Sequence, residues 1–224
     1  MLESAPMTSL VLASSSPRRR QLLALLQLDF TVSAADIDET VFRNEMPAHY
    51  VLRLAETKAR VIAQQADADR IILAADTTVV DGRDILGKPN DDEEAFAMLT
   101  QLRGRTHQVY TGVALLRTDD GALLTDLSVA DIVMRDYSDE EIRAYIATRD
   151  PFDKAGAYAI QHTDFHPVEA VRGCYAGVMG LPLCRVVGQL QKLNADLVAD
   201  APFNCQKSTD RDCPVYEKIM SAAL

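Results

Sequence analysis

A continuous apolar run at residues 71–75, Ile-Ile-Leu-Ala-Ala, constrains the fold of this chain more than any other stretch. A strand without a polar face must be buried on both faces, so the run predicts a central strand in a sheet covered by helices on either side. The run leads directly into an acid, Asp76. Because open α/β sheets bind ligands at the carboxyl ends of their strands, we expect Asp76 to be a functional carboxylate at that edge. The structural alternative is an acid that only caps the end of the strand.

The order of the other elements predicts an α/β fold. Apolar spacing, helix caps and turn residues indicate strands and helices that alternate at first, followed by an antiparallel hairpin that turns at Asp120-Gly121. The expected strands cover residues 10–12, 30–33, 71–80, 107–117 and 123–134, and the expected helices cover residues 17–26, 47–63, 91–102, 138–148 and 181–193. This order favours a mixed, twisted sheet with flanking helices over a purely parallel sheet.

Length and composition bound the domain organisation. A chain of 224 residues with 48% hydrophobic residues suits one large domain or two closely packed lobes around a cleft. Beyond residue 200 the sequence is polar and weakly patterned, so we expect a domain over residues 1–199 and a polar C-terminal tail over residues 200–224, with a short helix at 216–223. No apolar run is long enough to span a bilayer, and the first residues lack a basic segment, so we expect a cytoplasmic protein with no membrane partner.

The charge balance narrows the range of partners. The 23 basic and 33 acidic residues give a net charge of −10, which disfavours a nucleic-acid-binding surface. A small phosphorylated ligand remains compatible with this charge if a local basic cluster receives it. The four cysteines show no C-x-x-C spacing, so we expect reduced thiols, with a zinc site or a Cys205–Cys213 disulfide as alternatives.

Residues 10–26, LVLASSSPRRRQLLALL, predict such a basic cluster. A short strand leads into serines and Pro17, which are the residues expected at the start of a helix. Arg18, Arg19 and Arg20 then occupy the first turn, where cations oppose the helix dipole. Three cations at this end are unfavourable unless an anion lies among them, so we expect a phosphate site. The alternative is a solvated first turn of a surface helix.

Other polar residues suggest a metal site. Asp38 and Glu39 lie in an acidic loop and, together with Asp76, could hold a magnesium or manganese ion through carboxylate oxygens. Taken alone, the two loop acids look like an ordinary solvated loop. Taken singly, three lysines look like surface residues: Lys58, Lys88 and Lys154. Lys88 is the exception, because Gly87 and Pro89 restrain it. His162 and His166 have a spacing that could bind metal on a helix, but Pro167 favours a loop.

Eight segments, in this order, resemble the Maf family of nucleotide pyrophosphatases. They are LASSSPRRRQLL, IDET, YVLRLAETKA, ILAADTTVV, ILGKP, AFAMLTQLRGRTHQVYTGVAL, DKAGAYAIQ and VMGLPL. The resemblance extends from residue 10 to about residue 193 and leaves the tail outside. It is specific because several long segments agree together.

The resemblance implies an activity, a fold and a set of site residues. Members hydrolyse a nucleoside triphosphate to the monophosphate and pyrophosphate with a divalent cation (magnesium, manganese or cobalt), as cytoplasmic homodimers with a fold related to inosine-triphosphate pyrophosphatases. The segment DKAGAYAIQ looks like that of the branch acting on dTTP and UTP. By position, Asp76 would be the proton acceptor, the specificity positions would be Arg18, Thr77 and Gln161, and the other site residues would be Ser14, Arg19, Glu39, Lys58 and Lys88. His162 stands where the family commonly has glycine.

The chemistry of these side chains agrees with that activity. Four cations, Arg18, Arg19, Lys58 and Lys88, could offset the charge of a triphosphate, while Asp76 orients or deprotonates a water that attacks the α-phosphorus. The amide of Gln161 offers one donor and one acceptor, which suits the O4 and N3–H edge of uracil or thymine. Two alternatives are hydrolysis of modified pyrimidine nucleotides and a nucleotide-binding regulator of septum formation without significant turnover.

Overall fold

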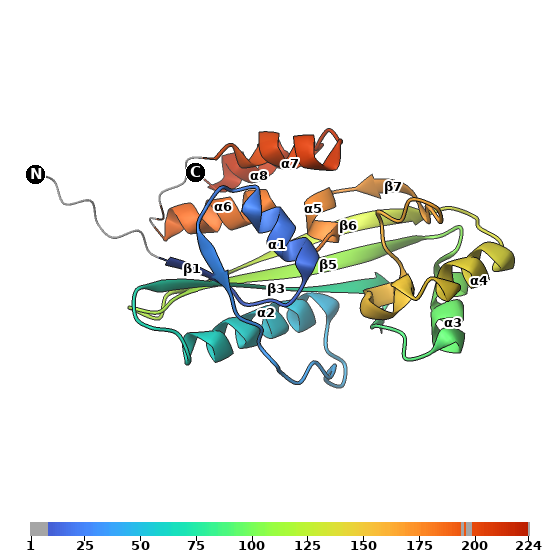
Figure 1. Cartoon of the computed structure of the whole chain (residues 1–224), viewed down its shortest axis with the longest axis horizontal. Coiled ribbons are helices and arrows are strands. Elements are labelled where there is room, and N and C mark those ends of the chain that lie inside the picture. Colours follow the sequence, from blue (N-terminus) through green and yellow to red (C-terminus); the bar gives the residue numbers. More distant parts are fainter. Residues whose placement is uncertain (1–8, 194, 196–198, 224) are drawn as a thin grey trace, which may run out of the picture.

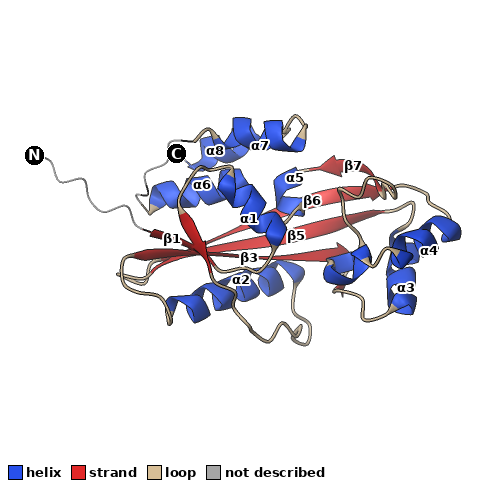
Figure 2. Ribbon diagram, viewed as in Figure 1, coloured by secondary structure: helices blue, strands red, loops and turns tan. Residues whose placement is uncertain are grey.

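A seven-stranded mixed sheet forms the centre of the protein in the computed structural model, which describes residues 9–193, 195 and 199–223. The strand order is β2-β1-β3-β5-β6-β7, with β4 paired to the far end of β3 (Figure 2). Only the β1–β2 and β1–β3 pairs are parallel. The strands are β1 (Ser9–Leu12), β2 (Phe30–Val32), β3 (Arg70–Asp81), β4 (Asp84–Leu86), β5 (Thr106–Arg117), β6 (Leu123–Met134) and β7 (Val168–Arg172). The predicted mixed α/β sheet is confirmed.

Helices cover both faces of the sheet at the β1 end. One face carries α1 (Pro17–Ala24), α6 (Leu183–Lys192), α7 (Ala201–Thr209) and α8 (Tyr216–Ala223), and the opposite face carries α2 (Pro47–Ala63) (Figure 1). Alternate residues of β3 separate the two cores: Leu73 packs in the cluster with α1 and α6, whereas Ile72 packs in the cluster with α2. The prediction that residues 71–75 are buried on both faces is therefore confirmed.

A third core cluster lies at the other end of the long strands. There β3, β5 and β6 pack with α3 (Asp92–Leu102), α4 (Asp139–Ala147) and two short 3₁₀ helices, η1 (Asp150–Asp153) and η2 (Ala155–Ala157). The predicted capping box of α4 is present: the Ser138 hydroxyl accepts from the Glu141 N–H, and the Glu141 carboxylate accepts from the Ser138 N–H. The two lobes thus share three strands, and α5 (Tyr175–Val178) joins them from the α1 face.

The predicted place of Asp76 at a strand end is wrong in one respect. Asp76 lies in the middle of β3, paired with Gly112 of β5, because antiparallel pairing with β5 continues the strand as far as Val80. The parallel neighbour β1 stops earlier, where Leu12 pairs with Leu73. Asp76 therefore lies just past the carboxyl end of the parallel part of the sheet, which is where ligands were expected.

Six elements were not predicted: β4, β7, α5, α7, η1 and η2. The stretch expected to be a weakly patterned tail contains α7, whose N-cap Asp200 accepts a hydrogen bond from the Phe203 N–H at 3.0 Å. The expected helix α8 follows, and Met220 packs against the α1 and α6 core. The division into residues 1–199 and 200–224 stays a prediction. The four cysteines are free thiols, and no helix in the described part of the chain is long and apolar enough to cross a membrane.

We predict that Gly112→Ala destabilises the fold through α2. A Cβ atom at Gly112 would lie 2.6 Å from the backbone carbonyl of Val51, so the helix would have to move off the sheet. Overpacking of this kind costs about 1–3 kcal/mol of unfolding free energy, which urea denaturation measures. The matched control is Gly87→Ala, where a Cβ meets nothing within 4 Å. Equal stability of the two variants would contradict the prediction.

Candidate active site

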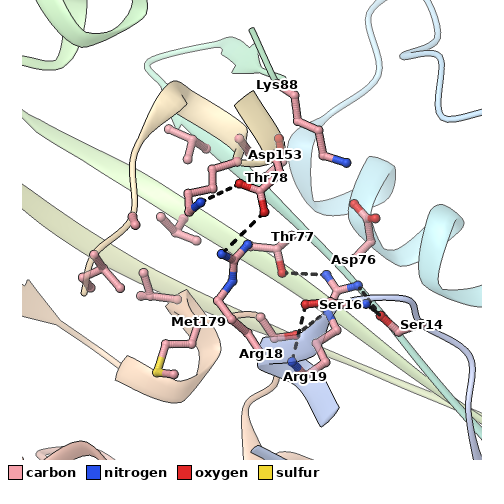
Figure 3. A pocket seen from close by; sticks show the side chains of 18 of the residues that line it. Ser14, Ser16, Arg18, Arg19, Asp76, Thr77, Thr78, Lys88, Asp153 and Met179 are labelled. Atoms are coloured by element: carbon pink, nitrogen blue, oxygen red, sulfur yellow. Dashed lines mark hydrogen bonds and ion pairs between the residues drawn. The ribbon is translucent and has the colours of Figure 1, made fainter. Parts of the chain in front are cut away.

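A cleft of about 960 Å³ opens between the two lobes, and Asp76 lines it. Its volume is in the range that holds a nucleotide-sized ligand. Nine of the predicted site residues line it: Ser14, Arg18, Arg19, Glu39, Lys58, Asp76, Thr77, Lys88 and Gln161. Figure 3 shows Arg18, Arg19, Asp76 and Lys88 around this one space. The structure therefore brings together residues that lie far apart in the sequence.

The tenth predicted residue, Asp38, does not line the cleft. Its exposed carboxylate instead accepts a hydrogen bond from the Thr40 N–H at 2.9 Å, within its own loop. Hydrogen bonding from the side chain of Thr40, and then from its backbone N–H, holds the pKa of Asp38 below its usual range. Arg20 is likewise exposed and outside the cleft, so two of the three consecutive arginines face the ligand space.

The start of α1 is built as the sequence predicts. Ser16 is the N-cap, its hydroxyl accepts from the Arg19 N–H at 3.4 Å, and Pro17 is the first helical residue. The buried Ser14 hydroxyl accepts from the Ser16 N–H at 3.2 Å. These bonds fix the turn from β1 into α1 and direct Arg18 and Arg19 toward the cleft.

Arg19 is a largely buried cation held by neutral oxygens. Its guanidinium donates to the carbonyl of Gly180 at 3.0 Å, to the hydroxyl of Ser14 at 3.4 Å and to the hydroxyl of Thr77 at 3.2 Å (Figure 3). Within the described residues, none of the ion pairs involves Arg19. Burial lowers the pKa of Arg19, although the charge of nearby Asp76 acts in the opposite direction. A buried guanidinium without a bonded carboxylate favours an anionic ligand.

Lys58 forms the second charged centre. Its Nζ lies 2.6 Å from Glu39 Oε1 and 2.6 Å from Asp76 Oδ1, so one ammonium bridges two carboxylates. Lys58 is buried on the face of α2 that packs on the sheet, seven residues after the fully buried Val51. The expectation of a surface lysine is wrong here because the helix phase places position 58 on the apolar face.

The pKa values of Asp76 and Glu39 shift in opposite directions, although both carboxylates contact the Lys58 ammonium. Burial raises the pKa of Asp76 and outweighs the attraction of Lys58 and Arg19. For the half-exposed Glu39, burial also acts to raise the pKa, but the hydrogen bond and charge of Lys58 outweigh it and leave the pKa lowered. Asp76 is therefore the stronger base of the pair, and a proton acceptor must bind the proton it removes.

The donor set fits a divalent cation that arrives with a phosphate ligand. No cluster of three or more His, Cys, Asp or Glu side chains able to hold a metal occurs in the described parts of the chain. Glu39 and Asp76 nevertheless contact the same nitrogen, so their oxygens lie close enough for one cation to bridge them. Magnesium typically takes one or two carboxylates and completes its shell with water and substrate phosphates. These residues suit that kind of shared site.

Further residues of the cleft were not predicted. Lys154 is buried rather than exposed, and its ammonium donates to Asp150 Oδ1 at 2.9 Å and also pairs with Asp153. Asp153 in turn lies 4.0 Å from the Arg18 guanidinium. The charged front of the segment DKAGAYAIQ was a signal for this cluster. His162 lies in a loop rather than on a helix, as Pro167 suggested, and its Nδ1 accepts from the Phe165 N–H at 3.0 Å.

Gln161 and Lys88 have few protein partners. The exposed Gln161 amide makes one weak contact, from Nε2 to the sulfur of Met179 at 3.4 Å. Lys88 is exposed, follows β4, and extends along the cleft wall (Figure 3). Both side chains can therefore turn toward a ligand at little energetic cost.

We predict that Asp76→Asn stabilises the fold at pH 8. Because burial raises the pKa of Asp76, the folded protein retains this proton more strongly than the unfolded chain, and ionisation lowers the unfolding free energy above that native pKa. The loss disappears as pH falls through the native pKa toward the ordinary value of 3.8. The melting temperature of the variant should exceed that of the wild type at pH 8, with a difference that shrinks on acidification.

Glu39→Gln is the matched control with the opposite sign. The lowered pKa of Glu39 means that its ionised form adds stability above the ordinary value of 4.5, and that this contribution is lost as pH falls through the native pKa. This variant should melt below the wild type at pH 8. If Asp76→Asn also melts below the wild type, attraction to Lys58 outweighs burial and the prediction is wrong.

Comparison with known proteins identifies the family. The sequence model described as Maf-like protein matches residues 9–193. A dTTP/UTP pyrophosphatase of Myxococcus xanthus is 50% identical over 194 residues, which cover 87% of this chain and 97% of that protein. One of Hahella chejuensis is 45% identical over 193 residues, covering 85% of this chain and 95% of that protein.

Solved structures show only a distant likeness. The Ham1 protein of Staphylococcus aureus aligns with a TM-score of 0.43 and 15% identity, over 57% of this chain and 72% of that chain. The family match, in contrast, covers both lobes and every predicted site residue. The chain belongs to the Maf family.

Proposed function

We propose that this protein hydrolyses dTTP and UTP to the monophosphate and pyrophosphate. The observation that carries the proposal is the partly buried Arg19 guanidinium, which among the described residues donates to neutral oxygens alone and shares a cleft with the Lys58–Asp76 pair. Arg19 can bind phosphate, and the carboxylate of Asp76 can accept a proton. Several Maf relatives that align over most of this chain carry the name dTTP/UTP pyrophosphatase, which supports the same reaction and substrates.

The cations would hold the triphosphate, and Asp76 would serve as the general base. Arg18, Arg19 and Lys88 lie on the wall of the cleft and can offset phosphate charge, which is the main requirement of phosphoanhydride cleavage. Asp76 accepts a proton from the water that attacks the α-phosphorus, and the bond to the bridging oxygen breaks to release pyrophosphate. The raised pKa of Asp76 suits this role, because a more basic carboxylate removes the proton more effectively.

Gln161 would read the pyrimidine. Its amide combines a donor and an acceptor, and among the described residues it makes a single weak contact, to the sulfur of Met179. Uracil and thymine present O4 and N3–H next to each other, which matches that pair. Cytosine has the reverse pattern at these positions, so the amide would have to turn over and give up its contact to Met179 before it could pair with that base.

Glu39 and Asp76, without Asp38, would hold the divalent cation. When bound, magnesium, manganese or cobalt supplies positive charge to the phosphates and lowers the pKa of the attacking water. Lys58 already holds the two carboxylates together, so few rearrangements are needed to admit the cation and the nucleotide. We further infer that the protein acts in the cytoplasm as a homodimer, without a nucleic-acid partner.

A panel of triphosphates tests the activity. With magnesium or manganese present, we expect release of pyrophosphate from dTTP and UTP, and a lower kcat/KM for CTP because the Gln161 amide must turn over to pair with cytosine. Preference for a modified pyrimidine triphosphate would assign the substrate to damaged nucleotides instead. Tight binding without turnover would favour a regulatory role and contradict the proposal.

Asp76→Asn tests the role of the base. The variant keeps the shape of the side chain but cannot accept the proton, so kcat should fall about 100-fold or more. Binding of UTP, measured by calorimetry, should remain within a few fold of the wild type. Full turnover in this variant would exclude Asp76 as the general base.

Glu39→Gln and Asp38→Asn test the metal assignment with two adjacent acids. After removal of divalent cations with EDTA, activity should be lost and should return with manganese. Glu39→Gln should raise the manganese concentration for half-maximal activity about tenfold or more, because it removes a direct ligand. Asp38→Asn should leave that concentration unchanged, since its carboxylate points to its own loop. An equal effect of both changes would contradict the assignment.

A further inference from the structure

A buried hydroxyl behind the cleft connects the phosphate-binding arginine to the sheet. Thr111 lies on β5, directly across from Thr77 of β3, and is only 1% exposed. It is absent from the lining of the cleft. Its Oγ1 lies 3.0 Å from Thr77 Oγ1 and 2.8 Å from the carbonyl oxygen of Gly177.

The direction of these hydrogen bonds follows from counting protons. The carbonyl of Gly177 can only accept, so Thr111 donates its single hydroxyl proton there. Thr77 must then donate its own proton to Thr111 Oγ1, because Thr111 has none left to give. Thr77 consequently accepts, at 3.2 Å, from the Nη2 group of Arg19. The three bonds form a relay from Arg19 through both hydroxyls to Gly177.

A second path joins Thr111 to the same guanidinium. The carbonyl of Gly177 also accepts from the Gly180 N–H at 2.9 Å, which closes the turn after α5. The carbonyl of Gly180 then accepts from Arg19 Nε at 3.0 Å. Gly180 has a φ of +113°, and a Cβ atom there would lie 3.2 Å from that Nε, so the turn and the arginine fit closely. Thr77 and Gly180, which both accept hydrogen bonds from Arg19, are therefore both linked to Thr111.

We propose that Thr111 is a positioning residue for nucleotide binding. It holds the Arg19 guanidinium in place through Thr77 and through the turn at Gly180, and it fixes the direction of the Thr77 hydroxyl. Thr77 can then only accept a hydrogen bond from a bound ligand, so a ligand donor must face it. The role of Thr111 in turnover rests on the proposed function, whereas its role in anion binding does not.

Thr111→Val and Thr111→Ser test the relay as a pair. Valine keeps the shape but removes the donor and acceptor, whereas serine keeps both. With UTP as substrate we expect KM to rise about tenfold in Thr111→Val, with a smaller change in kcat, because a loosened guanidinium binds phosphate less well. Thr111→Ser should recover wild-type KM within about twofold.

Ser128→Ala is the matched control. Ser128 pairs with Thr111 on the neighbouring strand β6, is also buried, and packs against Gly177 without a hydrogen bond to the relay among the described residues. It should leave KM unchanged. Melting temperatures of all three variants separate positioning from loss of fold. The proposal is overturned if Thr111→Val keeps wild-type KM, or if Thr111→Ser is as impaired as Thr111→Val.

Calorimetry with pyrophosphate separates this proposal from the proposed function. If the wild type binds pyrophosphate but hydrolyses no triphosphate, the proposed function fails, and the relay is still tested by affinity. Thr111→Val should then bind pyrophosphate about tenfold more weakly than the wild type, while Thr111→Ser and Ser128→Ala bind it as the wild type does. Equal affinity in all four proteins would overturn the relay.

Discussion

The Lys58 ammonium between Asp76 and Glu39 is the interaction on which the site depends. Charges buried away from water are strongly unfavourable unless they are paired. Here one cation satisfies two carboxylates from two different elements, β3 and the loop before α2. The contact thereby joins three segments that are distant in the sequence, and it keeps the base of the cleft polar although it lies against an apolar core.

Arg19 is stabilised by neutral oxygens instead of carboxylates, so the regions of the cleft around Lys58 and around Arg19 suit different functions. Carboxylates neutralise Lys58, so that region carries acid–base chemistry. The Arg19 guanidinium donates three hydrogen bonds, all to hydroxyl and carbonyl oxygens, which orient it without neutralising its charge. An anion binds most favourably beside Arg19, because a guanidinium that is already oriented loses little entropy on binding. A chain with a net charge of −10 can therefore still attract a polyphosphate at one point.

Local signals predicted the elements well and the contacts between them less well. Ser16, Pro17 and the apolar run at 71–75 act through their immediate neighbours, so caps and burial could be read directly from the sequence. Glu39 and Asp38 differ only in how one loop turns, and spacing says nothing about which of two adjacent acids faces the cleft. The helix phase places Lys58 on the buried face of α2, but its partner Asp76 comes from a distant strand and could not be read from a local pattern. Lys154 pairs with the nearby Asp150 and Asp153, and its burial requires the folded lobe around them.

The mixed sheet explains how a mid-strand acid can reach a ligand. A β1 strand as long as β3 would continue alongside Asp76 and block access to it from that side. In the structure β1 ends beside Leu73, and the chain turns into α1. The antiparallel strand β5 supports β3 beyond that point and contributes Gly112 opposite Asp76. Because Gly112 has no side chain, the α2 backbone approaches closely at Val51, and Lys58, two turns along the same face, reaches the carboxylate. The short strand β1 and Gly112 thus allow Asp76, its partner Lys58 and the N-terminus of α1 to lie around one cleft.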